Sequence, residues 1–426
     1  MALHVAHRTV SLDPRATWRL VQLEVASESR SLRSWFAMLT ACLVAGALGA
    51  AFTIAPGTEV FGTTPAFEWG VLISAYVFFV VTTSGLCLVS ALGQVFGVEA
   101  FRPVARRAAV LAAIFLVTGF VVIALDLHYP VRLLFGAVFS PSPSSAMWWM
   151  GTLYAIYLVF LVIELAGMFL GSESLAKAGS ALTLATAILA PSTLGAVFGT
   201  LVSRSFWHGG LAPVYLILTA LVSGAALLGI VFSLVERLGL RGGSASEAVV
   251  PALGKLLALM LSLTAFLTAW QTIVGLYGGV PGEFEATMAL VFGPLSVPFW
   301  VFTVGIGMVA PLAILLRPRV AGDRAKVVSD VLLASCLAFG GMFVERIAFV
   351  AAGQITPMSA ASGIVVGDFA AYVPSAVEVG IVVGALGLAG LLYTIAERFV
   401  DLGEPLGAPL AAVEIPPLPV AVEALP

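Results

Sequence analysis

Residues 67–93 read FEWGVLISAYVFFVVTTSGLCLVSALG. After Glu68 this stretch has no charged side chain. An apolar run of about 20 residues is long enough to cross the hydrocarbon layer of a membrane as an α-helix. Within lipid, backbone N–H and C=O groups must be hydrogen-bonded inside the segment, which a helix achieves and an isolated strand does not. We therefore predict that this stretch is a transmembrane helix.

Similar apolar runs recur along all of the 426 residues. The predicted spans are 34–54, 67–93, 105–126, 146–170, 178–200, 210–235, 251–275, 292–316, 327–351 and 371–396. Hydrophobic residues make up 60% of the chain and charged residues only 10%, whereas a soluble domain is usually about 25% charged. The sequence therefore predicts an all-α, polytopic membrane protein of about ten transmembrane helices, without a soluble domain of appreciable size.

An internal repeat organises the predicted helices. Tyr76 precedes Ser84-Gly85 in the second span, and Tyr215 precedes Ser223-Gly224 at the same spacing in the sixth. The repeat unit is then four helices, and because four is even, both copies face the same way across the membrane. The predicted parts are an N-terminal segment 1–33, a first transmembrane helix with its outer loop 34–66, two parallel four-helix-bundle repeats 67–200 and 201–351, an outer loop with the tenth helix 352–396, and a tail 397–426.

The basic residues predict the orientation of the chain. Most of the 20 lysines and arginines fall on one side of the predicted spans, which the positive-inside rule assigns to the cytoplasm. They are Arg8, Arg15, Arg19, Arg30, Arg33, Arg102, Arg106, Arg107, Lys177, Arg237, Arg241, Lys255, Arg317, Arg319, Arg324, Lys326 and Arg398. The opposite loops carry only Arg132 and Arg204. Both termini are therefore predicted to be cytoplasmic.

The sequence offers no ligands for a redox centre. Its three cysteines are isolated and lie in apolar runs, and without CxxC spacing neither an iron–sulfur cluster nor a structural zinc site is supported. Only His128 and His208 lie near the membrane, and neither is inside a predicted span. We expect no bound haem or iron–sulfur cluster of the chain's own and no metal site. The net charge of −3 gives no indication of nucleic-acid binding, and we expect no nucleic-acid partner.

A polar cluster follows the third span. Asp126, His128, Tyr129 and Arg132 lie within seven residues at the predicted membrane surface. Quinol oxidation needs groups that hydrogen-bond the ring oxygens and accept protons, and a histidine oriented by a carboxylate suits both tasks. We predict catalytic roles for Asp126 and His128 and quinone-binding roles for all four. The alternative is structural, with Asp126 capping the helix and Pro130 turning the chain.

Glu68 and Trp69 begin the second span on the same predicted side. They are candidates for the same quinone site, although a glutamate in this position is more often an ordinary residue of the membrane surface. His208 in the short loop after the fifth span is expected to be an ordinary interfacial histidine.

Glu164 lies deep in the fourth span, near its cytoplasmic end. Ionisable groups inside a bilayer are costly and are functional candidates, so we predict a proton-relay role, with Tyr76 and Tyr157 as further members of the path. Tyr157 precedes Glu164 by two helical turns and shares its face. A buried polar pair, or a carboxylate reaching the cytoplasmic surface, would also explain Glu164.

A second polar cluster is predicted at the outer ends of the last two spans. It contains Glu345, Arg346, Gln354 and Glu378. An Arg–Glu pair between helices would offset the cost of burying each charge. The structural role of holding helices together is therefore favoured for Arg346 and Glu378, with membership of the proton path as the alternative.

Six short motifs follow one another along the chain. They are Glu68-Trp69-Gly70 with Tyr76, Phe78, Phe79 and Gly85; Asp126-Leu127 with Pro130 and Arg132; Ser192-Thr193-Leu194-Gly195 followed by Trp207; Phe299-Trp300 with Gly305, Gly307 and Pro311; Gly341 and Arg346 with Gly353-Gln354; and Tyr372-Val373-Pro374-Ser375 with Glu378. In this order they resemble the NrfD / polysulfide reductase membrane-subunit family. The similarity is greatest to its ten-helix branch, which includes membrane subunits of hydrogenase-2, of Dsr-type complexes and of alternative complex III.

Three positions depart from the family pattern. His128 replaces a glycine, Ala190 a histidine, and Ala348 an asparagine. These departures concern individual proton-transfer residues and not the family as a whole.

The resemblance implies a function in quinone chemistry (menaquinone or ubiquinone). The chain would be the membrane subunit of a respiratory-type oxidoreductase complex and not a stand-alone enzyme, in a prokaryotic plasma (inner) membrane, with proton translocation as an additional role. Its implied partners are membrane lipid, an iron–sulfur (ferredoxin-like) subunit at the outer face, and a molybdopterin or cytochrome subunit. The alternative is a secondary transporter or a passive membrane anchor. A transporter should have interrupted helices at the midplane, for which Pro191 and Pro311 are the candidates.

Overall fold

The computed structural model describes residues 30–54, 60–127, 141–238, 246–317, 323–357, 367–400 and 402. The helices are α2 (Arg30–Ile54), α3 (Val71–Gln94), η2 (Glu99–Val104), α4 (Ala105–Asp126), α6 (Ala146–Phe169), α7 (Glu173–Gly199), α8 (Leu211–Arg237), α9 (Ser246–Tyr277), α10 (Glu283–Val291), η4 (Pro298–Val309), α11 (Ala310–Leu315), α12 (Arg324–Ala352) and α13 (Ala376–Phe399). Within these ranges ten helical segments are long and apolar enough to cross a membrane. The predicted all-α, polytopic fold is confirmed.

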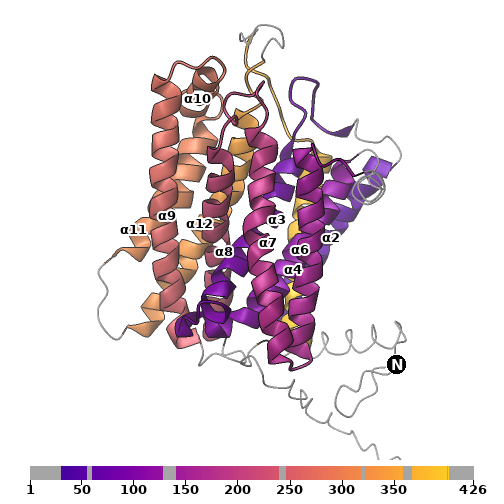
Figure 1. Ribbon diagram of the computed structural model, residues 1–426, viewed down its shortest axis with the longest axis vertical. Coiled ribbons are helices and arrows are strands. Elements are labelled where there is room, and N and C mark those ends of the chain that lie inside the picture. Colours follow the sequence, from indigo (N-terminus) through magenta and orange to yellow (C-terminus); the bar gives the residue numbers. More distant parts are fainter. Residues whose placement is uncertain are drawn as a thin grey trace, which may run out of the picture.

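The helices stand side by side, and α2 and α13 pack against each other at one side of the molecule (Figure 1). We call α3, α4, α6 and α7 the first helix group, and α8, α9, η4, α11 and α12 the second. The groups meet where α3 and α7 pack against α8 and where α12 packs against α3. Helices α2 and α13, from opposite ends of the sequence, pack against each other, and α13 also contacts α3 and α4.

Two glycines allow α3 and α8 to meet backbone to backbone. A Cβ atom added to Gly85 would lie 1.8 Å from the carbonyl oxygen of Ala220, and one added to Gly224 would lie 2.2 Å from the carbonyl carbon of Gly85. Small residues at such crossings let membrane helices approach closely, since packing and not water exclusion drives their association in lipid. These are the two glycines that the predicted sequence repeat pairs, so residues that the repeat makes equivalent contact each other.

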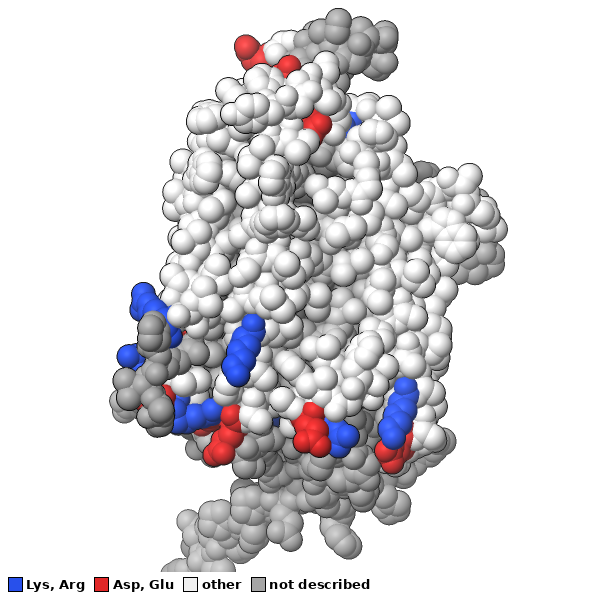
Figure 2. Space-filling model, turned by 60° about the vertical axis from the view of Figure 1, so that its left-hand side comes forward, with Lys and Arg blue, Asp and Glu red and all other residues white. Residues whose placement is uncertain are grey.

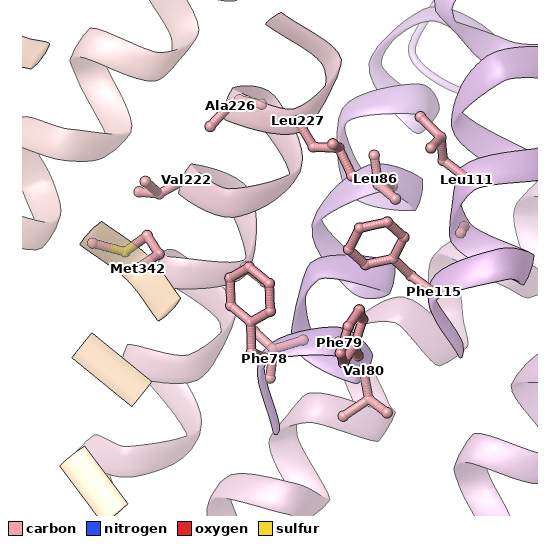
Figure 3. Packing of buried hydrophobic residues seen from close by; sticks show 14 of the residues in the cluster. Phe78, Phe79, Val80, Leu86, Leu111, Phe115, Val222, Ala226, Leu227 and Met342 are labelled. Atoms are coloured by element: carbon pink, nitrogen blue, oxygen red, sulfur yellow. The ribbon is translucent and has the colours of Figure 1, made fainter. Parts of the chain in front are cut away.

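Aromatic side chains fill the space beside this crossing. Phe78 of α3 makes edge contacts with Phe79 and with Phe339 and Phe343 of α12, and Phe79 packs against Phe115 of α4. Figure 3 shows Phe78, Phe79 and Phe115 in this core together with aliphatic side chains. Helix α3 is thus surrounded by protein, in agreement with the 89% of its span that is buried.

Charged side chains gather mainly at one end of the molecule, the lower end in Figure 2. We call this the basic end; the helix ends there carry Arg106, Arg107, Lys177, Arg237 and Arg324. We call the opposite end, which has Trp69, Trp207 and Tyr372, the aromatic end.

Several basic residues at the basic end are in ion pairs between helices. Arg107 is 1% exposed, forms a 2.6 Å salt bridge to Glu397 of α13, and lies 5.4 Å from the centre of the Phe232 ring of α8. Arg324 of α12 forms a 2.5 Å salt bridge to Glu236 of α8. In the sequence, these arginines indicated only the orientation of the chain. The structure shows that they also connect helices.

The predicted run 292–316 is not one regular helix. Its first part, η4, is a π-helix, and α11 continues from it as an α-helix with Pro311 in its first turn. By contrast, Pro191 lies within the continuous helix α7.

Candidate functional site

The start of α3 is held to the end of α12 by a single side chain. The amide of Gln354 accepts a hydrogen bond from the backbone N–H of Trp69 at 2.8 Å and donates one to the carbonyl of Trp69 at 3.0 Å. Because both backbone groups of Trp69 are bonded to one planar amide, the loop before α3 has a fixed position relative to α12.

The ring of Trp69 is part of an aromatic cluster. It stacks on Trp207 with a centroid distance of 5.2 Å and meets the edge of Phe198 at 5.4 Å. The indole N–H of Trp207 donates to the carbonyl of Phe349 at 2.9 Å. A side chain at Gly353 would overlap the Trp207 ring, since its Cβ would lie 1.9 Å from a ring carbon. The cluster therefore depends on contacts among α7, the loop before α8, and α12.

Glu378 receives hydrogen bonds from two neighbouring segments. Its carboxylate accepts from the backbone N–H groups of Gly62 and Ser375 and from the phenol of Tyr372, each at 2.8 Å. The same phenol accepts from the N–H of Val71 at 2.7 Å. Glu378 is thus at the N-terminus of its own helix and, through Tyr372, near that of α3, where helix dipoles stabilise a negative charge.

Gly70 makes this arrangement possible. A Cβ atom there would lie 2.6 Å from both the Glu378 carboxylate and the Tyr372 hydroxyl. Burial raises the pKa of Tyr372, and the carboxylates of Glu378 and Asp126 raise it further, against the opposing effect of the Val71 N–H. Tyr372 therefore keeps its proton and acts as a donor to Glu378.

Asp126 lies at the last residue of α4, and its carboxylate is close enough to Glu378 and Tyr372 to interact electrostatically with both. A carboxylate at a helix C-terminus is opposed by the helix dipole. His128, Tyr129 and Arg132, predicted to share its site, lie outside the described residues.

Glu68 is exposed at the aromatic end, beside Arg204. Burial lowers the pKa of Arg204, and the carboxylate of Glu68 acts in the opposite direction. Arg204 also donates to the carbonyl groups of Gln354 and Thr356, at 3.4 and 3.2 Å. Glu68 and Trp69 thus lie at the same end of the molecule as Asp126, as the sequence predicted.

Buried polar side chains extend from this end into the first helix group. Tyr76, Tyr154 and Tyr157 are almost fully buried, and the rings of the last two are 6.4 Å apart. Tyr154 interacts with Tyr76 and lies next to Ser84. Tyr157 donates to the carbonyl of Thr83 at 3.3 Å. The hydroxyl of Tyr154 has no hydrogen-bond partner among the described protein atoms, which is unusual for a buried polar group.

Glu164 is at the other end of this series. Tyr157 lies next to Cys87, and Cys87 is near enough to Glu164 for electrostatic interaction. The carboxylate of Glu164, 3% exposed, accepts a 2.7 Å hydrogen bond from Ser180, which also contacts Gln94. From Tyr76 to Gln94 the helix axis of α3 covers about 27 Å, at 1.5 Å per residue. Polar groups therefore follow one another from the aromatic end almost to the basic end.

Arg346 is in a separate group. It forms a 2.9 Å salt bridge with Glu345, its neighbour on α12, and donates to the hydroxyl of Thr219 on α8. The predicted link between α12 and a neighbouring helix is thus made through a threonine, and the ion pair lies within one helix. Glu378, expected in the same cluster, makes its hydrogen bonds to Tyr372, Ser375 and Gly62.

Gln354 and Tyr372 are the residues that sequence reasoning undervalued. Both occur in the motifs quoted above, but neither was assigned to the site. The sequence gives only a weak indication of their roles, because their partners are far away along the chain. Gln354 is 285 residues from Trp69, and Tyr372 is 301 residues from Val71.

Comparison with known proteins agrees with these observations. Residues 59–358 match the family described as polysulphide reductase, NrfD. The chain is 26% identical over 352 residues to the Hdr-like menaquinol oxidoreductase integral membrane subunit of Archaeoglobus fulgidus, a match that covers 80% of this chain and 86% of that protein. It is 24% identical over 322 residues to a selenate reductase subunit of Mesobacillus selenatarsenatis, covering 66% and 74% of the two chains.

A third relative, from Halobacterium salinarum, is named as a membrane subunit of dimethyl sulfoxide reductase. It is 27% identical over 408 residues, which cover 87% of this chain and 91% of the relative. The family match includes α3, α4 and α6 to α12, and therefore the start of α3, Asp126 and Gln354. The chain belongs to the NrfD family of polysulphide reductase membrane subunits.

Proposed function

We propose that this chain is the quinone-reactive membrane subunit of an oxidoreductase complex, with its quinone site around Asp126 and His128 at the aromatic end. The observation that carries the proposal is the position of Asp126. Its carboxylate interacts electrostatically with Glu378 and Tyr372 at one end of a series of buried polar groups, and Glu164 lies near the other.

The residues around Asp126 suit a quinone ring. Asp126 supplies a carboxylate at the membrane surface, and Glu378 and Tyr372 give it a polar surrounding. Trp69 lies at the same end and offers an aromatic face. A bound quinol supplies two electrons and two protons. The protein side chains hydrogen-bond the ring oxygens, with Asp126 and His128 accepting protons and Tyr129 and Arg132 orienting the ring.

Electrons must leave to another subunit, because the sequence has no ligand set for a redox centre. The relatives are named as subunits of oxidoreductases, which supports an iron–sulfur partner at the aromatic end and a molybdopterin or cytochrome subunit beyond it. The concentration of arginine and lysine at the basic end supports a cytoplasmic position for that end and for both termini, in a prokaryotic plasma membrane.

Glu164 is proposed to exchange protons between the quinone site and the cytoplasm. Its burial, its bond to Ser180 and its proximity to Cys87 support this role, and Tyr76, Tyr154 and Tyr157 lie between it and the aromatic end. The simpler alternative is that the hydrogen bond to Ser180 only joins α6 and α7.

The quinone site is tested with His128→Ala in the purified complex. Quinol-linked turnover should be lost while the subunits still assemble, and Phe266→Leu, a lipid-facing change on α9, serves as the control. Unchanged turnover in the His128 variant would place the site elsewhere.

The proton path is tested with Glu164→Gln in reconstituted vesicles, by measuring electron transfer and internal pH together. The glutamine keeps an acceptor for Ser180, so folding should be preserved while proton movement per electron falls. Equal proton movement in variant and parent would leave Glu164 with a structural role only.

One observation favours the alternative of a transporter. The π-helix η4 interrupts the eighth span, and π-helical segments often occur at functional sites. The family match argues against this alternative. Uptake of a solute by vesicles that contain only this chain would support a transporter, and no uptake would support the quinone-reactive subunit.

A further inference from the structure

Two adjoining cavities lie in the second helix group, between α8 and α9 near the aromatic end. The larger has a volume of about 300 Å³ and the smaller about 40 Å³. Phe206, Tyr215, Gln271 and Phe349 line both, so the two form one cleft with a wide part and a narrow inner part. We call this the α8–α9 cleft. Sites for small organic ligands begin at about this size.

The wide part of the cleft is bordered by lipid-facing side chains. Trp270 and Val274 of α9 are 52% and 55% exposed, and Leu211 of α8 is 41% exposed. These residues lie on membrane-spanning helices, where an exposed apolar side chain faces lipid. A ligand of this cleft would therefore enter from the bilayer.

The narrow part is lined by polar side chains from five helices, α8, α9, α10, η4 and α12. Tyr215 of α8 lies 3.4 Å from the hydroxyl of Thr268 on α9, and Gln271 and Glu345 line the same space. Thr303 also faces it, is 1% exposed, and has a hydroxyl without a hydrogen-bond partner among the described protein atoms. A buried, unpaired hydroxyl is rare, and this one lies on the π-helix η4.

The lining also indicates the class of ligand. Aromatic rings of Phe206, Trp207 and Phe349 form its walls, and such walls suit a flat ring. Among the residues that the structure describes, no lysine or arginine lines either cavity, whereas Glu283 and Glu345 do. The phosphate of a lipid headgroup would need cationic partners, so the cleft suits a neutral ring whose oxygens exchange hydrogen bonds with hydroxyl and amide groups.

We propose that the α8–α9 cleft binds the ring of a membrane-soluble quinone or quinol, at a site distinct from the one around Asp126. The proposal rests on the proposed function only in taking quinone as the ligand of the protein. Tyr215, Thr268 and Gln271 hydrogen-bond the ring oxygens, and the isoprenoid tail leaves between α8 and α9 into the lipid.

The experiment uses a photoreactive azidoquinone on the full-length chain, with its co-purifying subunits, in lipid nanodiscs. After illumination, labelled peptides are mapped by mass spectrometry. Label is expected in residues 211–277 and, separately, near Asp126. In Gln271→Leu, labelling of 211–277 should fall by about five-fold or more, as expected for the loss of one polar contact to the ring. His128→Ala should reduce only the label near Asp126.

Phe266→Leu is the matched control, because Phe266 is on the same helix, is 59% exposed, and does not line the cleft. Unlabelled quinone should compete for the label and added phospholipid should not. Label near Asp126 alone would overturn the second site and leave the proposed function standing. Label in 211–277 alone would support the second site and overturn the proposed quinone site around Asp126. Label that Gln271→Leu does not reduce, or that phospholipid displaces, would also refute binding of quinone in the cleft.

Discussion

Replacing Gly85 by alanine should weaken the contact between the two helix groups. The added Cβ would lie 1.8 Å from the carbonyl oxygen of Ala220 and 2.5 Å from its carbonyl carbon. Both are backbone atoms of a buried helix and cannot rotate away, so α3 and α8 would have to separate by roughly 1.5 Å to regain ordinary contact. Ser84, which lies next to Tyr154 and Tyr157, would move with Gly85.

The magnitude follows from two opposing effects. Forcing extra volume into a packed contact costs about 1–3 kcal/mol, and a clash with backbone belongs at the upper limit. Alanine regains up to about 1 kcal/mol of helix propensity over glycine. We expect a net loss of about 2 kcal/mol. The control is Gly151→Ala on α6, where a Cβ would have no atom within 4 Å, so that only the gain in propensity remains.

The assay is the fraction of monodisperse protein after heating in detergent, followed by size-exclusion chromatography. Gly85→Ala should lower the midpoint temperature and Gly151→Ala should leave it equal or slightly higher. Gly224→Ala should resemble Gly85→Ala, and the double variant should lose less than the sum, since one shift of α3 relieves both clashes. A midpoint for Gly85→Ala at or above that of Gly151→Ala would refute the close crossing of α3 and α8.

Two further predictions concern polar contacts. Glu397→Gln removes the carboxylate from the 2.6 Å salt bridge of the buried Arg107 and should destabilise the protein by about 3 kcal/mol. Glu173→Gln breaks an exposed pair and should change the thermal midpoint little; equal effects of the two would contradict a contribution of the Arg107–Glu397 pair to stability. Tyr372→Phe removes the hydroxyl between Val71 and Glu378, so amide hydrogen exchange at the start of α3 should accelerate, and unchanged exchange would show that this bond contributes nothing.

Much of the candidate site was visible in the sequence as separate residues. The positions of Glu164 near the basic end and of Asp126 at the opposite end follow from helix length and direction alone. Tyr157 could be assigned to the face of Glu164 by helical periodicity. The three residues after Asp126 that complete the predicted quinone site lie outside the described residues, and their roles remain predictions.

The partners of these residues could not be predicted in the same way. Gln354 bonds to Trp69, Tyr372 to Val71, and Glu397 to Arg107 across 285, 301 and 290 residues. Each bond depends on which helices are neighbours. The sequence offers no spacing or periodicity that identifies those neighbours, so Arg107 indicated only the orientation of the chain.

The sequence by itself determined that this is a membrane protein of about ten helical spans and which of their ends carry the basic residues. Lipid requires long apolar helices, and membrane insertion sorts the positive charges. Only the tertiary structure decided which helices are neighbours. In a soluble protein, a polar face marks the side of a helix that is turned to water. In lipid, both the buried and the outer faces are apolar, and small residues with precise packing decide the pairing. The contact of Gly85 with α8, the Tyr372–Glu378 network and the α8–α9 cleft all follow from that packing.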